Sequence, residues 1–409
     1  MALRTADWHK LPTSLTEVCI NTTLRCGQSF RWRQTAADEW SMALHGRILS
    51  LRQTPDHVHY RAIFPARSAH LPSPPLSTAP SVAGDDDDDT LALVRHYLNL
   101  GPDLGQLYAQ WAAADANFKK KAPKFAGVRI LRQDAWEALI GFICSSNNNI
   151  SRISGMVQNL CLHYGPLIGH MDGVPYHDFP TPDALSGDHV EANLRKLGFG
   201  YRAKYIATTA RIVARDKSPD WLRNLSNPES PQFGDLAKPA GDMQPQGREG
   251  YRKAHEELLA LQGVGPKVSD CVCLFGLGWS ESVPVDTHVW QIAQRDYKFG
   301  KGKHSSLTAA MYTNVANHFR KLWGKEAGWA HSVLFTADLK AFSERVVAKT
   351  EIKEEEVVIK KENDEQFIEH VVLKGTTKRK RVKREPDDEE KQIVEVKQEY
   401  SRRSKRRRA

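Results

Sequence analysis

The sequence predicts an α+β protein: an N-terminal antiparallel β-sheet domain packed on a mostly helical domain, followed by a disordered charged tail. Two changes of pattern along the chain predict this division. Residues 10–65 contain short alternating and β-branched runs separated by polar turns, which is typical of antiparallel strands. From residue 91 to residue 342, apolar residues recur at three- and four-residue spacing, which is typical of amphipathic helices.

Three segments interrupt or follow these patterns. Residues 66–90 are rich in Pro, Ser and Ala and end in five aspartates, which predicts a disordered insertion. Residues 226–249 predict a mobile loop within the helical domain. Residues 343–409 are charged and repetitive, with few apolar residues to form a core, which predicts a disordered tail.

Composition limits the classes of protein and the compartment. The 409 residues carry a formal net charge of +9, which suits a polyanionic partner. The six cysteines lie mostly in apolar runs and show no disulfide pattern, which predicts an intracellular protein. No apolar run approaches the roughly 20 residues that span a bilayer, so we expect no membrane partner.

The tail carries the localisation signals. Its basic clusters KRKRVKR and RRSKRRR are typical of nuclear import signals, so we expect the import machinery as a partner and a nuclear protein, with a mitochondrial fraction left open. Four tail lysines follow an aliphatic residue and precede a Glu by two positions, a pattern that resembles sumoylation sites. These lysines are Lys353, Lys360, Lys383 and Lys397.

One stretch, Leu261–Trp290, combines a glycine turn with two charged residues at predicted helix starts. Gly263 and Gly265 permit a tight turn with free backbone amides, and Pro266 suits the first position of the following helix. Free amides at a helix N-terminus bind phosphate without reading base sequence. The same pattern also fits an ordinary helical hairpin.

Two side chains in this stretch point to chemistry. Lys267 lies in the first turn of a helix, where the positive end of the helix dipole favours the neutral amine that a nucleophile needs. A lysine that contacts phosphate is the alternative. Asp286 suits an N-cap, and a carboxylate near a sugar C1′ would also stabilise the positive charge that develops when a glycosidic bond breaks.

The hairpin with its lysine and the downstream VPVD resemble the helix-hairpin-helix-GPD superfamily of DNA glycosylases. Further motifs, in the same order, resemble the eukaryotic 8-oxoguanine DNA glycosylase/AP lyases within it. These motifs are GQSFRW (Gly27–Trp32), FICSSNNNISRISGM (Phe142–Met156), LGFGYRAKY (Leu197–Tyr205) and GWAHSVLFTADL (Gly328–Leu339). The resemblance covers roughly residues 10–342 without the two predicted loops.

The resemblance implies a bifunctional enzyme that excises 8-oxoguanine, and related oxidised purines, opposite cytosine in double-stranded DNA. Lys267 would attack C1′, form a Schiff base and allow β-elimination, and Asp286 would be required. The damaged nucleotide must leave the stack, because its sugar cannot be reached in a duplex. The enzyme would act as a monomer and need no cofactor, and a structural cation at the hairpin backbone is left open.

The resemblance also assigns three sets of contact residues. The base pocket would be formed by Gly27, whose carbonyl would accept the lesion's N7–H, and by Cys271, His331 and Phe335. The opposite cytosine and the vacated position would be contacted by Asn147, Arg152, Tyr201 as a wedge, and Arg202. DNA phosphate would be held by Gly263, Gly265, Val268 and His288.

One of these residues departs from the family pattern. The better-known members carry a glutamine where this chain has His331, and an imidazole cannot both donate and accept as an amide does. Base selectivity and its pH response are therefore open at this position.

Two alternatives remain from the residues alone. One is a related glycosylase with another lesion preference, although relatives that hold a four-cysteine iron–sulfur cluster are excluded because no cysteine follows Cys273. The other is a non-catalytic protein that uses the hairpin only to bind DNA. A zinc enzyme is not favoured, because no paired His and Cys residues show metal-ligand spacing.

Overall fold

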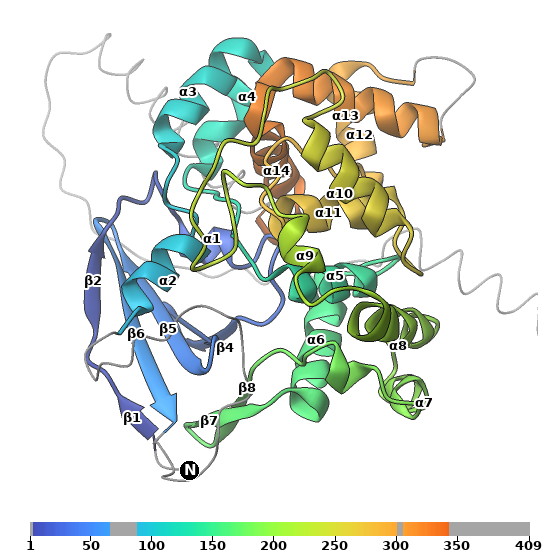
Figure 1. Ribbon diagram of the computed structural model, residues 1–409. Coiled ribbons are helices and arrows are strands. Elements are labelled where there is room, and N and C mark those ends of the chain that lie inside the picture. Colours follow the sequence, from blue (N-terminus) through green and yellow to red (C-terminus); the bar gives the residue numbers. More distant parts are fainter. Residues whose placement is uncertain (1–2, 66–87, 301–305, 343–409) are drawn as a thin grey trace, which may run out of the picture. The chain divides into compact units, whose positions relative to one another are not determined.

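The computed structural model describes residues 3–65, 88–300 and 306–342. Its N-terminal part is an antiparallel sheet on one side of a helical body (Figure 1). The sheet order is β1-β6-β5-β4-β3, and β2 also pairs with β6. The strands are β1 (Leu3–Thr5), β2 (His9–Pro12), β3 (Arg33–Ala36), β4 (Glu39–Leu44), β5 (Arg47–Thr54) and β6 (His57–Pro65).

The sheet has its own apolar core. Trp40 of β4 pairs with Leu51 of β5, which pairs with Tyr60 of β6, so these three side chains lie on one face. Helix α2 (Thr90–Tyr97) packs against that face through Leu93 and other apolar residues. Burying these side chains is worth about 1.5–3 kcal/mol each before the cost of ordering the chain, which explains why the sheet stays attached to the helices.

The helical body forms the larger core. Every residue of helix α5 is buried, and the helix lies at the centre of this body and packs against α11. The elements are α3 (Leu104–Ala114), α4 (Ala116–Lys121), η1 (Ala122–Phe125), α5 (Ala135–Cys144), α6 (Ile150–Tyr164), η2 (Asp183–Leu185), α7 (Val190–Lys196), α8 (Arg202–Arg211), η3 (Ile212–Asp216), α9 (Trp221–Asn224), α10 (Glu249–Leu259), α11 (Pro266–Phe275), α12 (Thr287–Tyr297), α13 (Ala309–Trp323), η4 (Gly324–Glu326), α14 (Ala327–Asp338) and η5 (Lys340–Phe342). The predicted α+β class is confirmed.

One local prediction is wrong, and one element was not predicted. Residues 13–32, expected to be rich in strands, contain the short helix α1 (Ile20–Thr23) and turns. The backbone of this segment forms hydrogen bonds with a distant segment instead of with a neighbouring strand. The Cys19 amide, for example, donates to the Gly127 carbonyl at 2.8 Å. The helical domain also contains a β-hairpin, β7 (Leu167–Met171) and β8 (Val174–His177). Its Asp172-Gly173 turn, with positive φ at both residues, is a hairpin signal in the sequence.

A buried ion pair attaches the segment just before β3 to the central helix α5. The Arg31 guanidinium donates to both carboxylate oxygens of Glu137 in α5, at 2.9 and 2.7 Å, and to the Ala43 carbonyl of β4 at 2.6 Å. Two parallel bonds fix both position and orientation. Residues 26–32, which include Gly27, are therefore held against the helical body.

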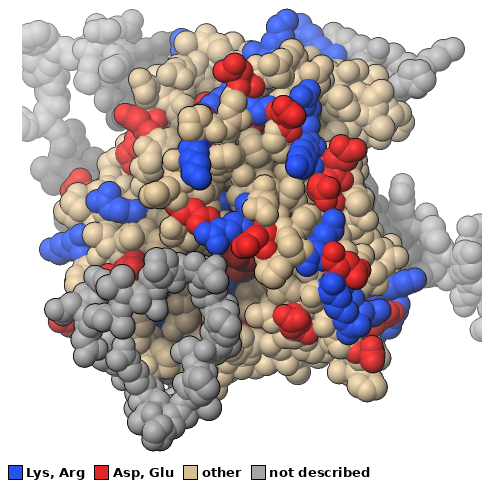
Figure 2. Space-filling model, in the orientation of Figure 1, with Lys and Arg blue, Asp and Glu red and all other residues tan. Residues whose placement is uncertain are grey.

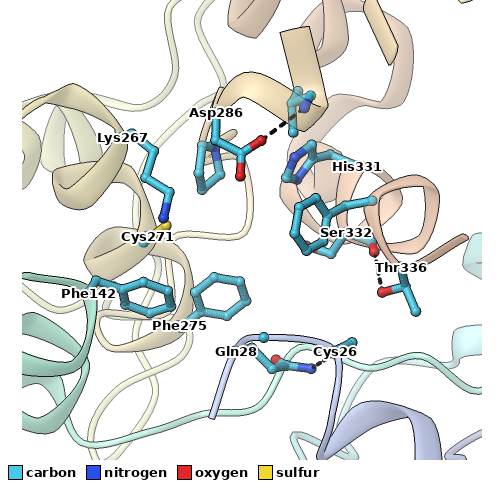
Figure 3. Close-up of a pocket in the computed structure, with 14 residues that line it drawn as sticks. Cys26, Gln28, Phe142, Lys267, Cys271, Phe275, Asp286, His331, Ser332 and Thr336 are labelled. Carbon is cyan, nitrogen blue, oxygen red and sulfur yellow. Dashed lines mark hydrogen bonds between the residues drawn. The ribbon is translucent and has the colours of Figure 1, made fainter. Parts of the chain in front are cut away.

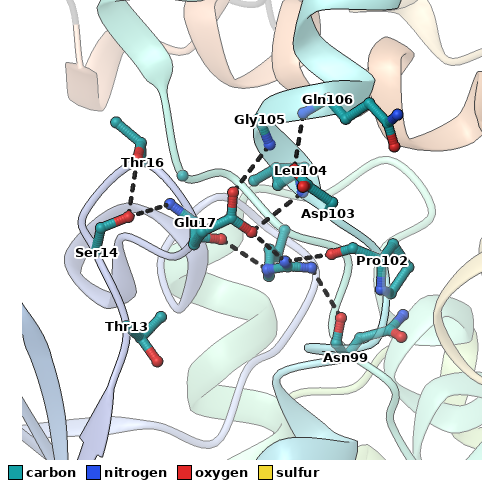
Figure 4. Close-up of polar contacts among 12 residues, drawn as sticks. Thr13, Ser14, Thr16, Glu17, Asn99, Pro102, Asp103, Leu104, Gly105 and Gln106 are labelled. Carbon is teal, nitrogen blue, oxygen red and sulfur yellow. Dashed lines mark hydrogen bonds and ion pairs between the residues drawn. The ribbon is translucent and has the colours of Figure 1, made fainter.

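A second polar cluster attaches the segment around Glu17 to the start of α3 (Figure 4). The Glu17 carboxylate accepts from the Leu104 and Gly105 amides at the start of α3, at 3.1 and 2.9 Å. It also accepts from Arg129, which is 1% exposed and donates further to the carbonyls of Asn99 and Pro102. A carboxylate at a helix N-terminus satisfies amides that have no partner within the helix.

Residues 226–248 contain no helix or strand, and side-chain bonds attach them to the helical body. Arg248, 1% exposed, donates to both oxygens of Glu281 at 2.9 Å and to Glu229 at 2.8 Å. The Asn227 amide donates to the Leu277 carbonyl at 2.8 Å. The mobility predicted for this segment stays a prediction.

Several sequence predictions lie outside the described residues: most of the insertion 66–90, the tail with its basic clusters, and the four tail lysines. Asp89 of the aspartate run is described, and its carboxylate pairs with Arg47 at 2.5 Å just before α2 begins. On the face shown in Figure 2, basic side chains are interspersed with acidic ones.

Candidate active site

The glycine turn joins α10 to α11, as predicted. Gly263 has φ +83°, and a Cβ there would lie 2.6 Å from the Tyr205 ring, so only glycine fits. Gly265 precedes α11 in extended conformation, and a Cβ there would meet open space. The two glycines therefore differ: packing requires Gly263, whereas Gly265 leaves the backbone accessible from outside. Pro266 begins the helix, as predicted.

Lys267 reaches inward from the first turn of α11 (Figure 3). Its Nζ donates to the Ser145 Oγ at 3.0 Å and lies 5.3 Å from the centre of the Phe142 ring. Both contacts come from α5 and its C-terminal cap. Cys271 follows one turn later, and burial raises the pKa of its thiol to about 12, so the thiol is protonated at neutral pH. The amine is therefore directed toward the helical core.

Asp286 begins α12, and its predicted capping role is confirmed. Its carboxylate accepts from the Val289 amide at 2.9 Å. That bond uses one oxygen of the carboxylate, so the other oxygen stays available to stabilise positive charge. In Figure 3 this carboxylate lies close to His331, on the opposite side of the pocket from Cys26 and Gln28.

One pocket, with about 450 Å³ of open space, brings together residues far apart in the sequence. Both charged residues, Lys267 and Asp286, line it. All four residues assigned to the base pocket by the resemblance line it too: Gly27, Cys271, His331 and Phe335. The remaining lining residues are Cys26, Gln28, Phe142, Phe275, Pro284, Val289, Ser332 and Thr336.

The Gly27 backbone has φ +85°, and a Cβ there would lie 3.0 Å from the Ile150 side chain. The neighbouring Gln28 side chain fixes this backbone: it donates to the Arg129 carbonyl at 2.8 Å and accepts from the Leu131 amide at 2.9 Å. Gln28 is 2% exposed. The glycine is thus required by backbone conformation and close packing, and its peptide group is held rigidly at the pocket.

His331 is 6% exposed; the Gly328 backbone one turn earlier acts on its ring, but neither ring nitrogen makes a well-formed hydrogen bond to a described residue. Burial lowers the pKa of the imidazole to about 4, against an opposing effect of Asp286. The ring lies nearly parallel to Phe335, with centroids 6.4 Å apart. His331 therefore presents a neutral imidazole, one donor and one acceptor, to the pocket.

The residues assigned to the opposite base lie outside the lining of this pocket. Asn147 has φ +48° and is exposed, Tyr201 is 46% exposed, and Arg152 is exposed. Arg202 is 3% exposed and lies 4.5 Å over the Tyr201 ring. Its guanidinium donates to the carbonyls of Ser146 and Asn147. The structure thus groups these residues around the turn between α5 and α6.

The residues assigned to phosphate lie at the starts of α11 and α12. The Val268 side chain is 4% exposed, so a phosphate contact there would use its main-chain amide. His288 is exposed and lies edge-on to Phe335, with centroids 6.0 Å apart.

The sequence prediction missed several residues that the structure brings to the site. Ser145 contacts Lys267, and Gln28 holds Gly27. Asp270, 1% exposed, accepts hydroxyl donors from Tyr251 of α10 and Tyr312 of α13, and so anchors the helix that carries the lysine. An acid inside the apolar run SDCVCLF was a signal for Asp270. Ser145 and Gln28 carried no such signal.

Within the described ranges, no group of three or more His, Cys, Asp or Glu side chains is placed to hold a metal ion. In the same part of the chain, no helix is both long and apolar enough to cross a membrane. All six cysteines are free thiols.

Two family models match consecutive parts of the chain, and together they include both charged residues of the pocket. Residues 10–139 match the family model "8-oxoguanine DNA glycosylase, N-terminal domain", and residues 140–318 match "HhH-GPD superfamily base excision DNA repair protein". An N-glycosylase/DNA lyase of Saccharomyces cerevisiae is 36% identical over 379 residues, covering 86% of this chain and 94% of the relative. One of Arabidopsis thaliana is 37% identical, covering 82% of each chain.

Solved structures share the fold. A structure of MBOgg1 in complex with a DNA ligand has a TM-score of 0.62 at 24% identity, covering 83% of this chain and 98% of that one. The Clostridium acetobutylicum 8-oxoguanine glycosylase/lyase, in complex with DNA containing cytosine opposite 8-oxoguanine, has a TM-score of 0.60 at 23% identity, covering 78% and 91%.

A helical hairpin with a lysine directed into a pocket, facing a capping aspartate, defines a base-excision DNA glycosylase of the helix-hairpin-helix-GPD class. Within that class, the chain belongs to the eukaryotic 8-oxoguanine DNA glycosylase/lyase family. The family predicted from the sequence is confirmed.

Proposed function

We propose that the protein is a bifunctional glycosylase and lyase that excises 8-oxoguanine, and related oxidised purines, from DNA opposite cytosine. The observation that carries this proposal is one pocket lined by an amine, a carboxylate, a glycine with positive φ and a neutral imidazole that makes no well-formed hydrogen bond to a described residue. The kinship to N-glycosylase/DNA lyases supports the reaction class. Double-stranded DNA is the substrate, because the fold is that of DNA-repair glycosylases.

Lys267 is the nucleophile. Its Nζ forms a bond to C1′ as the C1′–N9 bond breaks, and the electron pair leaves with the base, which takes up a proton. Loss of the second amine proton and opening of the sugar give a Schiff base. Removal of a C2′ proton then expels the 3′ phosphate by β-elimination. Asp286 lies on the same pocket and stabilises the positive charge that develops at the sugar.

The pocket reads the damaged base. The carbonyl of Gly27 accepts the proton on N7, which 8-oxoguanine carries and guanine lacks, so guanine meets two opposed lone pairs instead. Cys271 and Phe335 hold the faces of the base. His331 takes the Watson–Crick edge with a neutral ring, because burial keeps the pKa of the imidazole near 4. A buried imidazole without a well-formed hydrogen bond to the described residues is costly unless a ligand satisfies it, which supports this role.

The opposite strand is read at the turn between α5 and α6. Asn147, Arg152 and Arg202 supply donors to cytosine O2 and N3, and Tyr201 fills the vacated position in the stack. The exposed amides at Gly263, Gly265 and Val268, together with His288, bind phosphate. The enzyme acts as a monomer without a cofactor, since amine and carboxylate supply the chemistry. A structural cation at the hairpin backbone stays open.

The tail sequence supports import into the nucleus through its two basic clusters, and it offers the four lysines named above to sumoylation. A mitochondrial fraction stays open. Fluorescence of the tagged full chain, before and after the last cluster is changed to Ala, tests the nuclear address: we expect nuclear accumulation to fall.

Borohydride trapping tests the enzymatic proposal. Full-length protein is incubated with duplexes that carry 8-oxoguanine opposite each of the four bases, and the covalent adduct is measured after reduction. We expect the largest adduct opposite cytosine, and none for Lys267→Gln, which retains DNA binding. Trapping that survives in Lys267→Gln would move the nucleophile elsewhere, and binding without any trapping would favour a non-catalytic hairpin protein.

A further inference from the structure

The turn formed by residues 145–147, called here the SSN turn, contacts both halves of the site. It follows α5 and precedes α6. Its first residue contacts the nucleophile, and its next two contact the residues proposed to read the opposite base. Three consecutive residues therefore contact both the Lys267 amine and the residues proposed to read the opposite base.

Ser145 is held in a single hydrogen-bonding role. Its hydroxyl donates to the Phe142 carbonyl at 2.7 Å, as a helix C-cap, so its only proton is used. The oxygen is left to accept, and the Lys267 Nζ donates to it at 3.0 Å. One N–H of the amine therefore points at Ser145, and the amine also lies against the Cys271 thiol. Ser145 thus contributes one of the two polar contacts that set the direction from which Nζ can attack.

The carbonyls at the other end of the SSN turn accept hydrogen bonds from α8 and from its N-cap residue. The Ser146 carbonyl accepts from the Tyr201 hydroxyl at 3.0 Å and from Arg202. The Asn147 carbonyl accepts from Arg202 at 3.0 Å. Arg202 is nearly buried, so these carbonyls hold one of its amino groups in place.

A base that binds at Arg202 meets a guanidinium whose Nη2 is already bonded to the SSN turn, while its Nε has no partner among the described residues. If the guanidinium shifts so that its Nε reaches cytosine, the Nη2 bonds to the Ser146 and Asn147 carbonyls must stretch or break. Asn147 already has φ +48°, a left-handed conformation that is sparsely populated outside glycine. The SSN turn is therefore the part of the backbone expected to respond, and Ser145 moves with it.

We propose that Ser145 is a positioning residue for Lys267, and that the SSN turn transmits occupancy of the opposite-base site to the nucleophile. The identity of the opposite base then sets the rate of base removal as well as the strength of binding. This inference rests on the proposed function, because it takes Lys267 as the nucleophile and Arg202 as a reader of the opposite base.

The test compares single-turnover rates of base excision on duplexes that carry 8-oxoguanine opposite cytosine or opposite adenine. For Ser145→Ala in the full chain, we expect the rate opposite cytosine to fall about tenfold, as for the loss of one hydrogen bond, and the rate opposite adenine to fall about threefold. The ratio of the excision rate opposite cytosine to the rate opposite adenine therefore decreases. Affinity for a duplex with a tetrahydrofuran site opposite cytosine stays within about twofold of wild type.

Ser186→Ala is the matched control. Ser186 also caps a short helix and donates to the carbonyl three residues before it, at 3.0 Å, but it lies away from the pocket lining. Its replacement removes the same local bond and should leave both rates at the wild-type value. Ser145→Thr, which keeps the hydroxyl, should restore most of the rate.

Tyr201→Phe provides a second approach from an exposed side chain, in case Ser145→Ala lowers the melting temperature strongly. It removes the hydroxyl that donates to Ser146 and keeps the ring. We expect the same narrowing of the cytosine-to-adenine ratio. Equal loss on both duplexes in both variants, or no rescue by Ser145→Thr, overturns the inference. Those outcomes leave the proposed function intact, since that is overturned by trapping that survives in Lys267→Gln or by binding of wild-type protein without any trapping.

Discussion

The lesion pocket and the opposite-base surface are built differently. In the lesion pocket (Gly27, Cys271, His331 and Phe335), the groups that would read the base are buried or half-buried, and His331 makes no well-formed hydrogen bond to a described residue. On the opposite-base surface (Asn147, Arg152, Tyr201 and Arg202), most side chains are exposed, and the one that is buried is already hydrogen-bonded to the backbone.

The difference indicates how each region discriminates. A pocket whose polar groups are fixed by packing rejects a wrong base because unmatched polar groups lose their hydrogen bonds. On the opposite-base surface, the Arg202 guanidinium is already bonded to backbone carbonyls through Nη2, so discrimination there depends on how that side chain shifts. Lesion selectivity should therefore be lost by small steric changes, and opposite-base selectivity by loss of donors.

The largest effect is expected at Asp286, which serves both regions. Asp286→Asn keeps a good N-cap, so the melting temperature should change little, while the excision rate should fall about 100- to 1,000-fold because the carboxylate charge is lost. Asp286→Ala should add a loss of about 1 kcal/mol in unfolding free energy. Chemical denaturation and single-turnover kinetics separate the two roles. A fully active Asn variant would show that Asp286 only caps the helix.

Gly27→Ala tests the lesion pocket alone. The new methyl meets Ile150 at 3.0 Å, and φ +85° is strained for alanine, so the carbonyl must shift. We expect excision of 8-oxoguanine to fall at least about tenfold, with β-elimination at a preformed abasic site opposite cytosine nearly unchanged, because that reaction seats no base. Equal losses in both reactions would mean that the substitution damages the site generally.

Arg152→Ala tests the opposite-base surface alone. Arg152 is exposed, and its guanidinium donates only weakly to the Gly198 carbonyl, at 3.4 Å, so the fold should tolerate the change. Loss of its donors should reduce the preference for cytosine over adenine by about tenfold, as for one base contact. Preference for 8-oxoguanine over guanine, measured on the same opposite base, should not change. A change in that second preference would contradict the separation of the two regions.

The smallest effect concerns stability. The unfolded His331 ring gains its proton near pH 6.5, whereas burial delays this to about pH 4 in the fold, so the unfolded state binds more protons between these values. The contribution of this position to the free energy of unfolding therefore decreases as the pH falls through that window. At about pH 5.5 the decrease relative to about pH 7 is roughly 1 kcal/mol. His331→Gln should lose less stability between about pH 7 and about pH 5.5 than wild type, measured by thermal unfolding. Identical pH dependence would show that the ring is not buried neutral.

The same substitution addresses selectivity. His331→Gln restores an amide that both donates and accepts. We expect lesion preference in competition assays to change. An unchanged preference would mean that the imidazole does not read the base.

Local features of the site could be predicted from the sequence. Pro266 at a helix start, the glycine turn and the cap at Asp286 depend on neighbouring residues, and all three are confirmed. Prediction was wrong for residues 13–32, whose backbone bonds to the distant Gly127. It also missed the β7–β8 hairpin, although its Asp-Gly turn was a local signal.

Residue types, capping positions and the family motifs were determined by the sequence itself, because they depend on chemistry within a few positions along the chain. The resemblance predicted a shared base pocket for Gly27 and His331, but their approach to each other and to Lys267 depends on packing between the sheet and the helices, which only the tertiary structure decides. The same packing keeps the imidazole neutral and places Ser145 beside the amine. Burial and hydrogen-bond partners are properties of the assembled core, which no single segment contains.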